Sequence, residues 1–130
     1  MRIFSSILFI STIVFLSSCE ELLEVPDISG EEVMLLAPSD STVVTQANVN
    51  FTWNEVFEAK SYHIQVAQPS FSAASQIVID TLVVVDSTYL GTRFTKSLLD
   101  NGYEWRVKAL NSDFETEYTT HSFTVQTSGN

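Results

Sequence analysis

Apolar and polar residues alternate most clearly in the stretch 102–109 near the C-terminal end of the chain. The apolar side chains fall at every second position, and the positions between them are charged; the apolar set is Tyr103, Trp105, Val107 and Ala109. A period of two is that of a β-strand with one buried face. The stretch therefore predicts a core strand.

Three other stretches repeat this period. Their alternating apolar residues are Val49, Phe51 and Trp53, then Tyr62, Ile64 and Val66, and finally Phe123 and Val125. A shorter apolar run, 33–36, precedes Pro38, which limits further strand pairing. Because no stretch keeps a helical period, the sequence predicts an all-β domain.

The middle of the chain leaves two interpretations open. Residues 77–85 are β-branched and almost continuously apolar, so they form either one strand buried on both faces or two short strands that turn near Asp80 and Thr81. We favour the bend, because sandwich strands are usually short. A further strand is expected over 88–95 with Tyr89 and Phe94 facing inward. A turn over 98–102 follows, for which Asn101-Gly102 is the strongest local signal. About seven strands in total predict a two-sheet antiparallel sandwich.

The N-terminal residues have the pattern typical of a secretory signal peptide. A basic tip at Arg2 precedes an apolar run that is too short to span a bilayer comfortably, and the run ends in Leu16-Ser17-Ser18-Cys19. These four residues resemble the lipobox of bacterial lipoproteins, in which the cysteine is acylated and becomes the first residue after cleavage. The resemblance implies a signal peptide over 1–18, a lipid on Cys19, an acidic tether over 19–32 and a folded domain over 33–130.

The residues around this cysteine refine that expectation. Glu20 and Glu21 follow it directly, which resembles the surface-display signal of lipoproteins from the Bacteroidota and implies an outer-membrane, cell-surface location. Cys19 is the one cysteine of the chain, so a disulfide framework is excluded. The alternative is a free thiol in a cleaved leader or a buried core cysteine. The tether contains three apolar residues, Leu22, Leu23 and Val25. They either dock on a surface or are isolated apolar residues in a linker without a contact.

The charge balance restricts the partners. The chain has 16 acidic and 6 basic residues and a formal net charge of −10. Nucleic acids and anionic lipid headgroups are bound mainly through Lys and Arg, so neither is an expected partner. Membrane attachment would come from the acyl chains.

The aromatic positions carry a second resemblance. Phe51-Thr52-Trp53, the stretch 59–62, and Tyr103 with Val107 and Ala109 are similar to the core pattern of fibronectin type III domains. Leu98 or Leu99 fills that family's upstream leucine position. The likeness covers residues 36–127 and extends to the N-terminal domains of starch-utilisation surface lipoproteins. It implies a seven-stranded antiparallel immunoglobulin-like sandwich.

Two consequences follow for the large aromatic residues. Tyr103 stands at the start of its strand, where a hydroxyl can bond to upstream backbone as in the tyrosine corner of sandwich folds. Trp53 and Trp105 fall on inward positions, which favours core packing over a role as sugar-stacking platforms.

The sequence nominates no catalytic residue and no cofactor. His63 and His121 are the only histidines, and neither lies at ligand spacing from a cysteine or a carboxylate. Phosphate-binding loops and nucleophile elbows are also missing. Asp113, Glu115 and Glu117 alternate along one loop and are weak calcium candidates; a solvated acidic loop is the simpler interpretation.

The solvent side of the 102–109 strand is the candidate binding face. It would carry Glu104, Arg106 and Lys108, with His63 and Gln65 from the neighbouring strand. We hypothesise that this face meets a polar or acidic partner. The alternative is a solvated face with an ordinary cross-strand ion pair.

Two functions remain, both without catalysis. The first is a protein-interaction module with an envelope protein as partner, and the second is an accessory glycan-binding lipoprotein of a polysaccharide-uptake system. A glycan binder should expose aromatic residues, and the loops offer only Phe57, Phe71 and Phe114. Protein contact is therefore favoured, with the apolar 77–85 edge available for strand addition.

Overall fold

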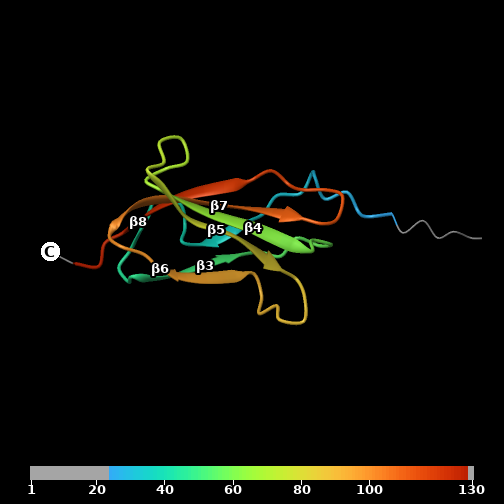
Figure 1. The fold of residues 1–130 in the computed structure, drawn as a ribbon, viewed down its shortest axis with the longest axis horizontal. Helices are drawn as coiled ribbons and strands as arrows, with labels where there is room; N and C mark the ends of the chain where they lie inside the picture. The colour runs from blue at the N-terminus through green and yellow to red at the C-terminus, as the bar shows by residue number, and fades with distance from the viewer. Residues whose placement is uncertain (1–23, 129–130) are drawn as a thin grey trace, which may run out of the picture.

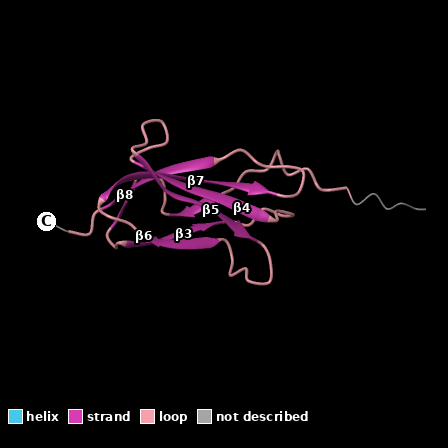
Figure 2. Cartoon of the chain, in the orientation of Figure 1, coloured by secondary structure: helices cyan, strands magenta, loops and turns pink. Residues whose placement is uncertain are grey.

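The structure, a computed structural model, describes residues 24–128 and consists of strands and loops in two layers (Figures 1 and 2). Eight strands follow one another along the chain: β1 (Leu35–Ala37), β2 (Thr42–Val44), β3 (Asn48–Trp53), β4 (Ser61–Gln68), β5 (Gln76–Val84), β6 (Arg93–Ser97), β7 (Asn101–Leu110) and β8 (Thr119–Val125). No helix in this part of the chain has the length and apolar character needed to cross a bilayer.

The strands form a three-stranded sheet in the order β1-β3-β6 and a five-stranded sheet in the order β2-β8-β7-β4-β5. This arrangement confirms the predicted all-β, immunoglobulin-like sandwich. The strand beyond the expected seven is the short β2, which pairs with β8 in parallel through Thr42↔Phe123, Val43↔Thr124 and Val44↔Val125. All other strand pairs are antiparallel.

The core lies between the two sheets and is centred on aromatic side chains. Trp53 and Trp105 are 1% and 0% exposed, which confirms their core role. Phe51 packs edge-on against Trp105 with ring centroids 5.1 Å apart, and Trp53 packs edge-on against Tyr62 at 5.6 Å. Edge-to-face pairs add about 0.5–1.5 kcal/mol to the burial of the rings themselves. The alternation of the sequence has therefore sorted the large residues into one core.

The predicted corner is present at the start of β7. The hydroxyl of Tyr103 donates to the carbonyl oxygen of Leu99 at 2.6 Å. Leu98 is buried while Leu99 is 85% exposed, so Leu98 occupies the leucine position of the core pattern. The turn predicted over 98–102 is present at 98–100, between the end of β6 and the start of β7, and it is shorter than predicted because the strand already begins at Asn101. The bonded carbonyl of Leu99 lies within that turn.

The middle of the chain differs from both expectations. Residues 77–84 do not bend at Asp80 and Thr81 but belong to one nine-residue strand, β5, with a bulge opposite Val66 and Ala67. This strand is an edge of its sheet, so its apolar run is not buried on both faces: Ile79 is 4% exposed and Leu82 56%. The strand predicted over 88–95 begins only at Arg93, because Thr88 and Tyr89 lie in a loop whose backbone folds onto Asp86.

The packed part of the chain begins before the predicted boundary at residue 33. Ile28 is 3% exposed and belongs to the core cluster. The side-chain amide of Asn111 donates to the carbonyl oxygen of Pro26 at 2.8 Å, which ties the segment to the β7–β8 loop. The segment is thus part of the domain from about residue 26. Cys19, the signal segment, and Leu22 and Leu23 lie outside the described residues.

Candidate functional site

All five residues of the predicted binding face lie on the solvent side of the five-stranded sheet, here called the outer face. In the β4–β7 register, His63 is opposite Lys108 and Gln65 is opposite Arg106, with Glu104 one step further along the same side of β7. Their neighbours at alternate positions, such as Tyr62 and Trp105, point into the core. The five side chains are half-buried, so they form a connected surface.

Arg106 stands at the centre of this surface between two aromatic rings. Its guanidinium carbon lies 4.0 Å from the ring centroid of Phe71 and 4.3 Å from that of Tyr118. Its Nε donates to Oε1 of Gln65 at 2.9 Å. A cation over an aromatic face is attracted by the ring quadrupole, by about 0.5–1 kcal/mol at exposed sites. The two rings and the Gln65 amide therefore hold the guanidinium in one orientation.

Glu104 holds one of these rings in place. Its Oε1 accepts a hydrogen bond from the backbone N–H of Phe71 at 2.8 Å. The bond joins β7 to the loop between β4 and β5, far away in sequence. Glu104 thereby positions Phe71 over Arg106.

His63 connects the other side of the face. Its Nε2 bonds to Oδ1 of Asp80, and its Nδ1 lies 2.6 Å from the hydroxyl of Tyr118. A carboxylate only accepts hydrogen bonds, so Nε2 carries the proton, and in the neutral ring Nδ1 accepts from the Tyr118 hydroxyl. The hydrogen bond from His63 lowers the pKa of Asp80. The chain of three residues spans β5, β4 and the residue directly before β8.

Lys108 completes the surface. Its Nζ lies 3.2 Å from Oε2 of Glu115 and 4.8 Å from the Tyr118 ring centroid. Glu115 was one of three calcium candidates, and it faces this ammonium group. No set of three metal-binding side chains occurs within residues 24–128, so Asp113, Glu115 and Glu117 do not gather into a cation site there.

Two aromatic residues of this surface, Phe71 and Tyr118, are absent from the predicted binding face. Phe71 is predicted only as an aromatic residue in a loop. A signal for Tyr118 was present, since it shares the alternation of β8 with Thr120, which pairs with Arg106 on the outer face. No sequence signal places Phe71, because its position depends on the path of the β4–β5 loop.

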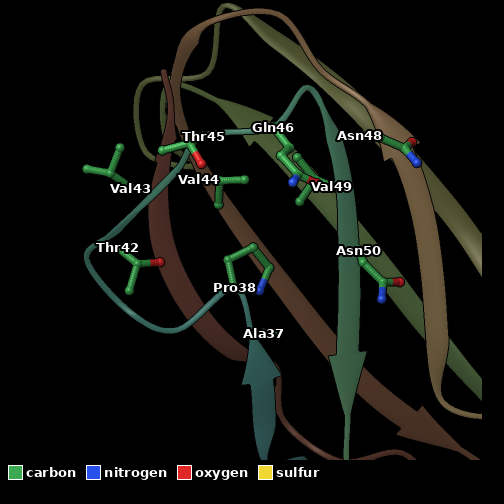
Figure 3. A pocket seen from close by; sticks show the side chains of 10 residues that line it. All are labelled: Ala37, Pro38, Thr42, Val43, Val44, Thr45, Gln46, Asn48, Val49 and Asn50. Carbon is green, nitrogen blue, oxygen red and sulfur yellow. The ribbon is translucent and has the colours of Figure 1, made fainter. Parts of the chain in front are cut away.

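An open groove of about 370 Å³ lies elsewhere, between the β2 segment and β3 (Figure 3). The residues that line it are uncharged: Ala37, Pro38, Thr42, Val43, Val44, Thr45, Gln46, Asn48, Val49 and Asn50. None of them exchanges a proton near neutral pH. The groove therefore offers hydrogen bonds and apolar contact but no acid–base pair.

Comparisons with known proteins found no matching protein-family model and no matching curated protein. Several solved structures resemble the chain, among them two at 16% sequence identity. One, described as FN3tt, has a TM-score of 0.49 over 72% of this chain and 94% of its own. The other, CopC from Methylosinus trichosporium OB3b, has a TM-score of 0.48 over 73% of this chain and 94% of its own.

Proposed function

We propose that the chain is a non-catalytic protein-interaction module, anchored by a lipid on Cys19 in the outer membrane and displayed at the cell surface. The proposed binding surface is the outer face. The observation that carries the proposal is the fixed orientation of Arg106 between Phe71 and Tyr118, with its Nε bonded to Gln65.

Arg106 has donors left for a partner. A guanidinium has five N–H groups, and among the described residues Gln65 is the one side chain that accepts from it. The two terminal nitrogens suit a carboxylate, which accepts two parallel hydrogen bonds from arginine. Arginine and tyrosine are also the residues enriched at the energetic centres of protein interfaces.

The rigidity of this arginine favours binding. Ordering a long side chain on association costs about 0.5–1.5 kcal/mol. The rings of Phe71 and Tyr118 already restrict Arg106 before a partner arrives. A protein that presents an acidic side chain to the outer face would meet a donor group that needs little further ordering.

The same contacts favour a protein partner over a glycan. Sugars stack on aromatic ring faces, and the guanidinium of Arg106 covers one face of Phe71 and one face of Tyr118. The remaining loop aromatic that is strongly exposed is Phe57, at 86%, on the β3–β4 loop away from the outer face. Glycan binding for a polysaccharide-uptake system is therefore the second proposal and an outcome of the same test.

The anchoring proposal rests on the lipobox-like residues 16–19 and has its own test. Cells expressing the full chain are labelled with a palmitate analogue, and the label is compared with that of Cys19→Ala. We expect the label to be lost in the variant and the wild-type protein to be accessible to protease on intact cells. Equal labelling of both proteins would contradict the proposal.

The binding proposal is tested by photo-crosslinking on intact cells. A photo-reactive amino acid replaces Thr120, the exposed β8 residue opposite Arg106. The matched control replaces Thr95, exposed on β6 in the other sheet. We expect one discrete protein adduct from position 120, none from 95, and at least a tenfold loss of the adduct when Arg106→Ala is added.

Two results would overturn the binding proposal. One is equal crosslinking from both positions, and the other is an adduct that persists unchanged in Arg106→Ala. An adduct that disappears on glycosidase treatment and carries no protein would replace the protein-interaction proposal with the glycan-binding one.

A further inference from the structure

We propose that two copies of this chain pair through the free edges of their β5 strands, so that the two five-stranded sheets become one continuous antiparallel sheet. The strand β5 ends the five-stranded sheet on the side away from β2. An edge strand presents a row of unpaired backbone groups, which is a template for another strand. The proposal is separate from ligand binding at the outer face.

β5 differs from the other three edge strands of the sandwich. β1 and β2 have three residues each, and β6 has five residues that include Arg93 and Lys96. Short length and positive charge are the usual means by which edges avoid pairing. β5 has nine residues, Gln-Ile-Val-Ile-Asp-Thr-Leu-Val-Val, with neither proline nor lysine. Its bulge lies near its first residues, opposite Val66 and Ala67, so the regular part of β5 from Ile79 onward lacks the protection that the other edges have.

The native hydrogen bonds show which backbone groups of β5 are free. Just past the strand, the backbone N–H of Val85 donates to the carbonyl oxygen of Lys60 at 2.9 Å, so Val85 faces β4. Hydrogen-bonding direction alternates along an antiparallel strand. The backbone groups of Thr81 and Val83 therefore face β4, as those of Val85 do. The N–H and C=O groups of the residues next to them in the strand point to the open edge. These residues are Asp80, Leu82 and Val84, of which Val84 has only its N–H free because its carbonyl oxygen accepts from the N–H of Asp86 at 3.1 Å.

The side chains along this edge are apolar and exposed. Leu82 is 56% exposed and Val84 49% exposed. Asp80 is the only charged residue of β5, and its carboxylate is bonded to His63 on β4. A second strand at this edge would partly cover two large apolar side chains without burying a free charge, and each Å² of apolar surface removed from water contributes about 25 cal/mol.

The pattern of β5 fits a second copy of itself. An antiparallel pair with its two-fold axis at Leu82 places Leu82 opposite its counterpart and Asp80 opposite Val84 of the other copy. The backbone groups of Asp80 and Leu82 are free, so the two Leu82 residues exchange two hydrogen bonds, and the C=O of Asp80 accepts from the free N–H of Val84. The C=O of Val84 already accepts from the N–H of Asp86 at 3.1 Å. The two Asp80 residues are then offset by four positions, about 13 Å along the strand, which exceeds the screening length of about 8 Å in physiological salt.

Cysteine scanning in the full-length protein on intact cells tests both the pairing and its register. Single variants carry Thr81→Cys, Leu82→Cys or Val83→Cys. Directly opposed residues in such a pair have Cα atoms about 5.5 Å apart, within the 4.4–6.8 Å range of a disulfide. We expect mild oxidation to give a reducible species of twice the monomer mass with Leu82→Cys and at least tenfold less with its two neighbours.

A matched pair of variants controls for random collision and for apolar surface in general. Val43 lies on β2, at the opposite edge of the same sheet. Its exposed fraction of 58% is similar to the 56% of Leu82. Val43→Cys should give no dimer. In native mass spectrometry of the detergent-solubilised chain, Leu82→Lys should lower the dimer fraction at least tenfold and Val43→Lys should leave it unchanged.

A backbone variant separates pairing from side-chain effects. Leu82→Pro removes an N–H that points to the open edge, so the β4–β5 ladder should persist, as reported by an unchanged circular dichroism spectrum, while the dimer is lost.

Three results would overturn the proposal: a wild-type chain that is monomeric by native mass spectrometry, equal crosslinking of Leu82→Cys and Val43→Cys, or a dimer that survives Leu82→Pro. None of these results affects the Arg106-dependent adduct from position 120, and the loss of that adduct would not affect the β5 pairing.

Discussion

Tyr103 fixes the chain reversal that precedes its own strand, because its hydroxyl donates to the carbonyl oxygen of Leu99 at 2.6 Å. The Tyr103 ring is 2% exposed and stacks on Phe123 with centroids 5.3 Å apart. Leu98, immediately before the bonded carbonyl, is buried as well. One residue thus connects the β6–β7 loop, β7 and β8.

Tyr103→Phe should destabilise the domain while preserving its fold. The change removes one hydrogen bond and keeps the packed ring, so we expect a loss of about 0.5–1.5 kcal/mol in the free energy of unfolding. Urea unfolding followed by tryptophan fluorescence measures it. Tyr103→Leu, which also removes the ring stacking, should cost more. An unchanged free energy of unfolding in Tyr103→Phe would show that the hydroxyl contributes nothing.

Arg106 should order the β4–β5 loop through Phe71. In Arg106→Ala the loop loses the cation under its ring, although Glu104 still accepts from the Phe71 N–H. We expect amide hydrogen exchange over residues 69–75 to become at least severalfold faster, with the β7 amides unchanged. Arg106→Lys should give an intermediate rate, because an ammonium group also interacts with aromatic rings but is not planar. Unchanged exchange in both variants would contradict this role.

Ile28 should contribute to stability as a core residue. It is 3% exposed and packs in the main cluster, so Ile28→Ala is expected to cost about 2–5 kcal/mol, the usual range for such a truncation. The matched control is Ile77→Ala, since Ile77 is 45% exposed and should lose far less. If both variants lost the same small amount of stability in urea, the segment before residue 33 would not be part of the folded domain.

Acid should weaken the attachment of the β1–β2 loop to β8. The backbone hydrogen bond from Ser122 lowers the pKa of Asp40. Hydrogen bonds from the side chain and the backbone of Thr127, just past β8, lower the pKa of Asp100 on the β6–β7 loop. A carboxyl whose folded pKa is below its unfolded value of about 3.9 stabilises the fold above that pH, and the contribution is lost as pH falls through the folded pKa. Stability should therefore decline below about pH 4. Urea unfolding from pH 6 to 2 measures this decline. Asp40→Asn should make the decline less steep, and the double variant Asp40→Asn, Asp100→Asn should make it less steep still. An unchanged dependence of stability on pH in both variants would show that these two carboxylates do not cause it.

The strands with regular alternation could be predicted from sequence, and the reason is physical. In β3, β4, β7 and β8 one face is buried, so the period of two appears directly in the residue types. The same alternation identified Trp53 and Trp105 as core residues and placed Arg106 and Lys108 on the solvent side. Local composition was sufficient wherever burial was one-sided.

The remaining parts depend on contacts between distant residues. β5 is almost continuously apolar although it is an open edge with exposed apolar residues, and a sequence does not distinguish such a strand from one buried on both faces. Phe71 joins Arg106 only through the path of a loop fixed by Glu104. Ile28 enters the core from a segment without any period. In each case the position of the residue depends on which distant part of the chain it contacts, and the residue type alone does not show that.

The short parallel pair of β2 and β8 determines how the domain would respond to mechanical tension. The described chain enters at one end of the sandwich and leaves at the other (Figure 1). A pull between the two ends draws β2 and β8 in opposite directions along their own axes, because the two strands run parallel. The hydrogen bonds between β2 and β8 lie across the pulling direction, so they would be loaded in shear and would bear the force together. In a hairpin pulled open from its ends, the hydrogen bonds break one at a time. A tether at one end and a partner at the other would therefore load the strands in the geometry that resists extension best.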